Sequence, residues 1–235
     1  HYMLNSDINA FIVKEAQVQN GDVVVEIGPG TGSLTNVLVN AGALVLAIEK
    51  DPHMAALVSE RFKKNGKVKV VQEDFTRCHI KEHIASFSAS AREGSDCEHL
   101  AKAVSNLPFN ITTEALKILL PMGEDETALR LVGASPRTCE YRSINIFVNF
   151  YSEPEYKFKV QRTNFFPQPN VDAAIVAFRL KHVDEYPPIA SQERFFSMVN
   201  SAFNGKRKML RKSLQHLRAS HDIQLALKAL GLLET

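Results

Sequence analysis

The feature that most constrains the fold is the alternation, over the first third of the chain, of short apolar runs with segments of helical periodicity. Residues 22–27 (DVVVEI), 43–48 (ALVLAI) and 67–72 (KVKVVQ) are rich in aliphatic and β-branched side chains, as is typical of buried parallel strands. Residues 33–40 and 51–62, which separate them, repeat apolar side chains at helical spacing. This repetition predicts an α/β fold with right-handed crossovers and a mostly parallel, doubly wound sheet.

The remainder of the chain predicts a fourth strand, an antiparallel edge hairpin and a second domain. The small, polar residues 87–98 indicate a surface loop or insertion. The further elements expected are a strand at 101–105, helices at 112–120 and 142–151, and paired strands at 155–160 and 171–180. Because the pattern beyond Pro187-Pro188 is wholly helical, we predict domains at 1–183 and 184–235.

Composition excludes several classes of protein. The three cysteines are odd in number and widely spaced, which suits neither a disulfide framework nor a zinc site, so we expect a reducing compartment and no metal. No apolar run approaches the roughly 18 residues that span a bilayer. We expect no signal or transit segment within these residues, although the abrupt start at His1 leaves a processed leader open.

A glycine-rich turn follows the first predicted strand and opens the first predicted helix. The segment Glu26-Ile27-Gly28-Pro29-Gly30-Thr31-Gly32 lets the backbone approach a ligand closely, beside the free N–H groups of a helix N-terminus. A dinucleotide fingerprint would require glycine where this chain has Ser33. The spacing G-x-G-x-G, with Glu26 two positions ahead, instead resembles motif I of class I methyltransferases. A glycine triplet alone is also a common structural turn.

Polar residues at the ends of the next strands strengthen this interpretation. Glu49 ends the second strand, where a carboxylate can accept both ribose hydroxyls, and Lys50 follows it. Asp74, after the third strand, can accept a hydrogen bond from an adenine amine, and Phe75 can form an apolar wall. Each alone is more often a turn or cap residue, but together with Asn106 after the fourth strand they indicate a nucleotide-like ligand at one sheet edge.

The tetrapeptide Asn106-Leu107-Pro108-Phe109 resembles the [DN]-[LIP]-P-[YF] motif of enzymes that methylate exocyclic amines of bases. Because the lone pair of adenine N6 is delocalised, hydrogen bonds to the Asn106 oxygen and a Leu107 or Pro108 carbonyl would make the nitrogen more nucleophilic. Pro108 restricts where these carbonyls point. Phe109 can stack on the base, which contributes about 1–3 kcal/mol. The alternative is a strand-ending turn without chemistry.

A basic cluster near the end of the chain indicates a polyanionic partner. The stretch 203–218 contains no Asp or Glu, and its cations include Lys206, Arg207, Lys208 and Arg211. A solvated helix face explains the same pattern equally well.

Taken together, these motifs resemble the ribosomal RNA adenine N6,N6-dimethyltransferases, a family related to the Erm methyltransferases and the mitochondrial transcription factor B proteins. The segments FFPQPNVD (165–172) and FNGKRKMLRKSL (203–214) carry the most specific resemblance. It implies a class I methyltransferase fold (Rossmann-like, with a small C-terminal helical RNA-binding domain) and S-adenosyl-L-methionine as cofactor. It also implies N6-methylation, as N6,N6-dimethylation of two adjacent adenines, in small-subunit ribosomal RNA within a pre-assembled particle.

The resemblance also assigns residues. His1, Met3, Glu26, Gly28, Gly30, Glu49, Lys50, Asp74, Phe75 and Asn106 correspond to cofactor contacts, and Phe109 and Phe165 to aromatics that sandwich the target adenine. Phe165 serves equally well as a core residue. We expect a monomer in ribosome biogenesis, located in the chloroplast stroma, with the mitochondrion or bacterial cytoplasm as alternatives.

The chain departs from the family pattern in several places. Phe109 stands where Tyr is usual, and Asn170 where Lys is common. Between Gly123 and Glu124 an apolar strand of the family is missing, and the chain stops near Thr235, short of the family's final helices. We expect these segments to exist in the natural protein, because losing a central strand would expose unpaired backbone.

Two other functions are compatible with the motifs. One is a ribosome-assembly or transcription factor that keeps the fold without methyl transfer, which an intact Asn106–Phe109 motif argues against. The other is an adenine-N6 DNA methyltransferase, against which only the resemblance argues.

Overall fold

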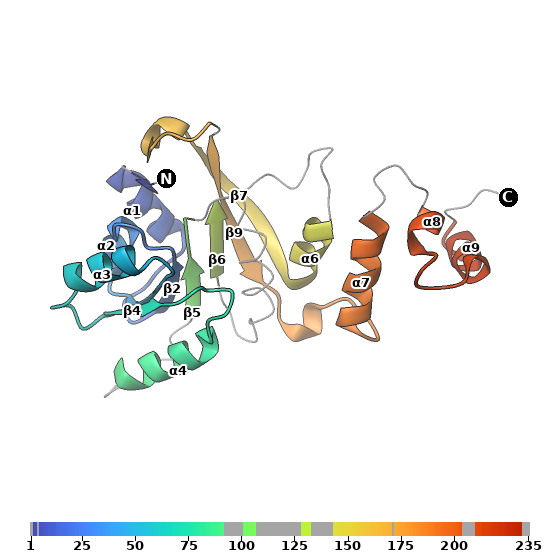
Figure 1. Ribbon diagram of the computed structural model, residues 1–235, viewed down its shortest axis with the longest axis horizontal. Helices are drawn as coiled ribbons and strands as arrows, with labels where there is room; N and C mark the ends of the chain where they lie inside the picture. The colour runs from blue at the N-terminus through green and yellow to red at the C-terminus, as the bar shows by residue number, and fades with distance from the viewer. Residues whose placement is uncertain are drawn as a thin grey trace. The chain divides into compact units, whose positions relative to one another are not determined.

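The computed structural model describes residues 2–3, 5–91, 101–106, 128–132, 143–170, 172–203 and 210–231. Figure 1 shows its helices and strands. The strands are β1 (Tyr2–Met3), β2 (Val23–Ile27), β3 (Leu44–Glu49), β4 (Val68–Gln72), β5 (Ala101–Val104), β6 (Ala128–Val132), β7 (Ser152–Val160), β8 (Phe165–Phe166) and β9 (Ala173–Leu180). The helices are α1 (Ser6–Glu15), α2 (Ser33–Asn40), α3 (Pro52–Arg61), α4 (Ile80–Ala91), α6 (Ser143–Tyr151), α7 (Gln192–Phe203), α8 (Leu210–Leu214) and α9 (Ser220–Ala229), with 3₁₀ turns η2 (Arg162–Asn164) and η3 (Val183–Glu185).

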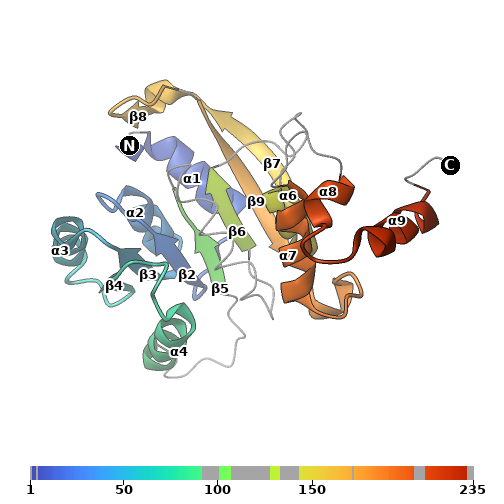
Figure 2. The same ribbon diagram turned by 45° about the vertical axis from the view of Figure 1, so that its right-hand side comes forward.

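Within these residues, the main sheet has seven strands in the order β4-β3-β2-β5-β6-β9-β7. The pairs from β4 to β6 are parallel, whereas β6–β9 and β9–β7 are antiparallel. Figure 2 shows β2, β5, β6 and β9 side by side. The predicted parallel sheet with an antiparallel edge hairpin is therefore confirmed.

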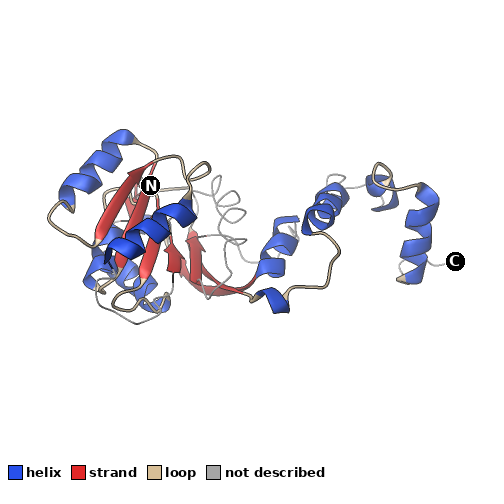
Figure 3. Cartoon of the chain, turned by 90° about the horizontal axis from the view of Figure 1, so that it is seen from below, coloured by secondary structure: helices blue, strands red, loops and turns tan. Residues whose placement is uncertain are grey.

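The chain order reverses at the centre of this sheet. From β2 the chain moves outward to β3 and β4, and it then returns to β5 on the other side of β2. Because such crossovers are right-handed, α2 and α3 cover one face and α4 covers the opposite face. Figure 3 shows helices on both faces of the sheet. The carboxyl ends of β2 and β5 thus flank a topological switch point, where open α/β sheets bind ligands.

The core of this region lies between the sheet and the helices, because both faces of the parallel strands are covered. All five residues of β2 are buried, and Val24, Val45 and Leu38 are completely inaccessible. Helix α3 begins where the Asp51 carboxylate accepts hydrogen bonds from the backbone N–H groups of His53 and Met54, at 2.8 and 3.1 Å. Such an N-cap stabilises a helix by about 1 kcal/mol.

One sequence prediction needs correction. Residues 87–91 are not loop but the last turn and a half of α4, and Phe87 and Ser88 are buried. The small residues misled the prediction because their composition resembles that of a loop, although Ser88 is buried within the helix. Strand β6 lies between β5 and β9, and the position after Gly123 at which a family strand is expected lies outside the described residues. The predicted helix at 112–120 and residues 92–98 lie outside the described residues.

The chain divides into two compact units, His1–Ser135 with Tyr151–Tyr186, and Pro136–Phe150 with Pro187–Thr235. The second unit therefore includes most of α6, which the prediction placed in the first domain. Its centre is a set of aromatic rings: Phe147 and Phe150 of α6 approach Phe196 of α7 with centroids 4.9 and 5.2 Å apart. None of the helices in the described part of the chain is long and apolar enough to cross a membrane.

Candidate functional site

The candidate site is built on the carboxyl edge of strands β2, β3, β4 and β5. Register pairs Ile27 with Ile48, and Glu49 with Gln72, so the strands end together. The turns that follow them carry Gly28, Asp74 and Asn106. The structure therefore brings the predicted cofactor turn and the predicted catalytic asparagine to the same edge, on either side of the switch point.

The glycine turn has the backbone geometry that its sequence requires. Gly28, Gly30 and Gly32 have φ values of +69°, +57° and +79°, in the left-handed region that disfavours other residues. The Gly28 N–H donates to the Ile48 carbonyl at 2.9 Å, which fixes the turn to β3. A Cβ on Gly28 would meet nothing within 4 Å, whereas one on Gly32 would lie 2.8 Å from the Phe62 ring. Gly28 thus faces open space, whereas a side chain at position 32 would clash with the Phe62 ring.

Glu26, which precedes the glycine turn, is anchored in the protein interior. Its side chain is buried, and its carboxylate accepts a hydrogen bond from the Thr35 hydroxyl of α2 at 2.6 Å. Burial raises the pKa of Glu26 to about 7, against the lowering effect of the Thr35 hydrogen bonds. Glu26, a predicted cofactor contact, is therefore hydrogen-bonded to helix α2, which begins at the end of the glycine turn.

Two acidic side chains follow the neighbouring strands. Glu49 Oε1 accepts from the Asp51 N–H at 2.9 Å, and the side chain is half-buried. Asp74 forms an ion pair with Lys50 at 2.8 Å and accepts from the Thr76 N–H and hydroxyl at 3.1 and 2.8 Å. The Lys50 and Thr76 hydrogen bonds lower the pKa of Asp74 to about 2. Asp74 is therefore available to accept hydrogen bonds as an anion at neutral pH.

The end of β5 is tied directly to the glycine turn. The Ile27 N–H donates to the Ser105 hydroxyl at 3.1 Å, and Ser105 is buried. This bond places Asn106, which is half-buried, next to the residue that precedes Gly28. Leu107, Pro108 and Phe109 lie outside the described residues.

Met3 and Phe165 lie in the hydrophobic core of the first unit. They are opposite each other in the antiparallel pair of β1 and β8, and both belong to the core cluster. Phe165 is 5% exposed, whereas Phe166 beside it is 65% exposed. This burial favours the core alternative for Phe165 over stacking on a base. Phe75 is also buried, so its ring packs within the protein.

Several predicted contacts fall where the structure describes no side chain. His1 and the cations Lys206, Arg207 and Lys208 lie outside the described residues, and Arg211 is described only as part of helix α8. These assignments remain predictions.

Sequence reasoning missed two residues that position the site. Ser105 joins β5 to β2, and Thr35 anchors Glu26. Thr35 lies in the first turn of α2, so its reach back toward β2 follows from the strand–turn–helix pattern. Ser105 carries no comparable signal, because a serine at a strand end is ordinary.

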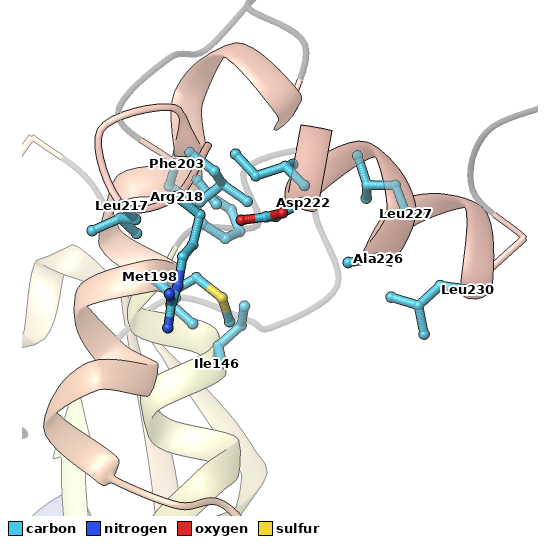
Figure 4. A pocket seen from close by; sticks show the side chains of 13 residues that line it. Ile146, Met198, Phe203, Leu217, Arg218, Asp222, Ala226, Leu227 and Leu230 are labelled. Carbon is cyan, nitrogen blue, oxygen red and sulfur yellow. The ribbon is translucent and has the colours of Figure 1, made fainter. Parts of the chain in front are cut away.

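A cavity of about 500 Å³ lies wholly within the second unit (Figure 4). Its lining comes from α6, α7, α8 and α9 and is apolar apart from Arg218 and Asp222. It offers no carboxylate pair or glycine turn, so it does not suit a nucleotide-like ligand.

The residues at the sheet edge fit the S-adenosylmethionine implied by the resemblance. The cofactor has no pyrophosphate, and the open space in front of Gly28 admits close backbone contact. Glu49 and Asp74 supply carboxyl acceptors at the ends of successive strands, suited to ribose hydroxyls and an adenine amine.

Comparison with known proteins agrees with this geometry. A family model described as ribosomal RNA adenine dimethylase matches residues 1–234. The chain is 62% identical to the "Ribosomal RNA small subunit methyltransferase, chloroplastic" of Arabidopsis thaliana, over 99% of this chain and 71% of that protein.

Solved structures give the same fold. The 23S rRNA methyltransferase ErmE superposes with a TM-score of 0.65 at 24% identity, covering 99% of this chain and 91% of that one. A dimethyladenosine transferase from Plasmodium falciparum has a TM-score of 0.67 at 20% identity, covering 100% and 84%. At these identities the likeness concerns the fold alone, and it confirms the predicted class I methyltransferase architecture.

Proposed function

This chain belongs to the ribosomal RNA adenine dimethylase family, and from that premise we propose that the carboxyl edge of its sheet is the site of methyl transfer to adenine. The chain is an enzyme that uses S-adenosyl-L-methionine to methylate the N6 amine of adenine in ribosomal RNA. The observation that carries the location is the meeting of the Gly28 turn and Asn106 at the switch point, through the Ile27–Ser105 hydrogen bond.

The chain's own residues hold the cofactor, which supplies an electrophilic methyl group when bound. Glu49 accepts hydrogen bonds from its ribose, and Asp74, kept ionised by Lys50 and Thr76, accepts one from its adenine amine. Gly28 allows the backbone to approach without a side chain between. The buried hydrogen bond between Thr35 and Glu26 stabilises the conformation of the turn.

Asn106 orients the adenine that receives the methyl group. Its side-chain oxygen accepts a hydrogen bond from one N6–H, which draws the nitrogen toward a tetrahedral, more nucleophilic form. No strong base is required, because the amine becomes acidic once it has gained the methyl. The rate enhancement therefore comes mainly from alignment and from fixed dipoles. A paired adenine cannot reach the site, so the target is unpaired or flipped out.

The family also supports a proposal for the substrate and its setting. We propose dimethylation of two adjacent adenines in small-subunit RNA of a pre-assembled particle, by a monomer whose helical region from residue 184 contacts the RNA. The chloroplastic name of the Arabidopsis relative supports a plastid location, and we propose the stroma.

Mass mapping of the product tests this proposal. The enzyme is incubated with S-adenosylmethionine and plastid small subunits that lack the modification, and the RNA is digested and analysed. We expect N6,N6-dimethyladenosine at two neighbouring positions of the small-subunit RNA, with none formed in duplex DNA. Methylation of another base, or of DNA instead of the particle, would contradict the proposal.

A further inference from the structure

A cluster of three potential metal ligands lies on the segment that joins β4 to α4. Glu73 follows β4, Cys78 lies in the next turn, and His83 is in the first turns of α4. One ligand atom of each, a carboxylate oxygen, the thiol sulfur and a ring nitrogen, lies within 4.8 Å of the others. Nothing in the methyl-transfer mechanism uses Glu73, Cys78 or His83.

The spacing of these atoms is close to that of a tetrahedral site. With zinc bonds of about 2.0–2.1 Å to nitrogen and oxygen, two such ligands stand about 3.4 Å apart on a tetrahedron. His83 Nε2 and Glu73 Oε1 are 3.4 Å apart. Sulfur, with a bond of about 2.3 Å, belongs about 3.6 Å from each of them. The cluster therefore needs only a small inward movement of the thiol.

The three side chains differ in their exposure to solvent. Cys78 is buried, whereas the side chains of Glu73 and His83 are 42% and 26% exposed. Burial, with Glu73 beside it, raises the pKa of the Cys78 thiol to about 12. The Cys78 sulfur therefore lies on the buried side of the cluster, and the partly exposed Glu73 and His83 side chains lie on its outer side.

We propose that Glu73, Cys78 and His83 bind Zn²⁺, with water in the fourth position. A mixed thiolate, imidazole and carboxylate set suits this borderline-soft ion better than magnesium or calcium. On binding, the Cys78 S–H bond breaks and a Zn–S bond forms, and the proton leaves to solvent. The metal would tie β4 to α4 and so brace the segment 73–79 that carries Asp74 and Phe75. The proposal is independent of the methyl-transfer proposal.

Cobalt binding tests the site, because Co²⁺ replaces Zn²⁺ and gives a thiolate charge-transfer absorption when sulfur is a ligand. The metal-free full chain is titrated with Co²⁺ alone, and Zn²⁺ is then added to displace it. We expect one equivalent with a thiolate band in the wild type. Cys78→Ser should abolish the band, and His83→Ala should lower the affinity by at least about tenfold.

Matched variants on the same chain separate this site from general thiol or histidine binding. His79, which pairs with Glu82 at 3.4 Å on the surface of the same segment, provides the histidine control. His79→Ala and the double variant Cys97→Ser/Cys139→Ser should keep the wild-type band. A wild type without a thiolate band, or a band that survives Cys78→Ser or is unchanged in His83→Ala, would overturn the proposal. Circular dichroism without metal checks that each variant is folded.

Discussion

The buried carboxyl group of Glu26 makes the stability of the first unit depend on pH. Its pKa is raised from 4.5 to about 7, so between these values the unfolded chain is ionised while the folded protein keeps the proton. The unfolded state then binds fewer protons, and the free energy of unfolding falls as pH rises through this window. The stabilisation is complete below pH 4.5 and is lost above the folded pKa.

Glu26→Gln should remove this dependence while keeping a group that can bond Thr35. Relative to wild type, we expect the variant to gain on the order of 3 kcal/mol in unfolding free energy between about pH 4 and about pH 8. Urea denaturation at a series of pH values measures the difference, and other titrating groups cancel in it. Parallel pH curves for the two proteins would contradict the buried, protonated state.

Gly28 combines a backbone conformation that favours glycine with open space in which a ligand can bind. Gly28→Ala introduces a side chain at φ +69° and a methyl group in the open space before the turn. We expect at least about a tenfold loss of S-adenosylmethionine affinity by calorimetry, with a strain cost of about 1–2 kcal/mol. Gly231, at φ +68° with nothing within 4 Å of a Cβ, is the matched control. Gly231→Ala should carry the strain and keep the affinity; equal affinity losses would refute the role of Gly28.

At the scale of elements, a buried ion pair joins β5 to the segment before β2. Lys102 Nζ contacts Asp22 Oδ2 at 2.7 Å and the Gln17 carbonyl at 2.6 Å, and both charged side chains are at most 7% exposed. Lys102→Met should cost about 3–5 kcal/mol, because it leaves the Asp22 charge buried without its partner. The double variant Asp22→Asn/Lys102→Met should recover most of that loss.

The exposed pair Arg179–Glu153, 2.6 Å apart between β9 and β7, is the control for this prediction. Arg179→Met should change the free energy of unfolding by less than about 1 kcal/mol. Thermal or urea unfolding compares the two variants. Similar losses for Lys102→Met and Arg179→Met would show that burial does not set the cost.

The elements were predictable where hydrophobic periodicity was strong. Buried parallel strands such as 22–27 are continuous apolar runs, and the glycine spacing located the turn, so the edge that carries the site followed from sequence. The end of α4 was missed, because small residues such as Ser88 pack closely and resemble a loop in composition. The burial of Phe165 beside exposed Phe166 was also undecided, because it depends on pairing with β1, which is distant in sequence. The Glu73–Cys78–His83 cluster escaped notice because counting cysteines does not detect mixed ligands.

At the scale of the whole molecule, catalysis and RNA contact are expected from different units of the chain. Changing Lys206, Arg207 and Lys208 to Gln should weaken RNA binding and reduce the slope of log affinity against log salt by about 2. Fluorescence anisotropy over a potassium chloride series measures this slope. The exposed residues Lys63, Lys64 and Lys67 allow a control with the same charge change. An equal change of slope in both triple variants would indicate a non-specific charge effect.

The central claim is that the Asn106 amide holds the amino group of the target adenine beside the bound cofactor. Its most direct test is the rate of a single turnover of methyl transfer to unmodified small subunits, at saturating S-adenosylmethionine. Asn106→Ala should slow this step by about 100-fold or more, whereas Asn106→Asp, which keeps an acceptor oxygen, should retain more of the rate than Ala. An Asn106→Ala enzyme that transfers methyl groups at the wild-type rate would contradict the account.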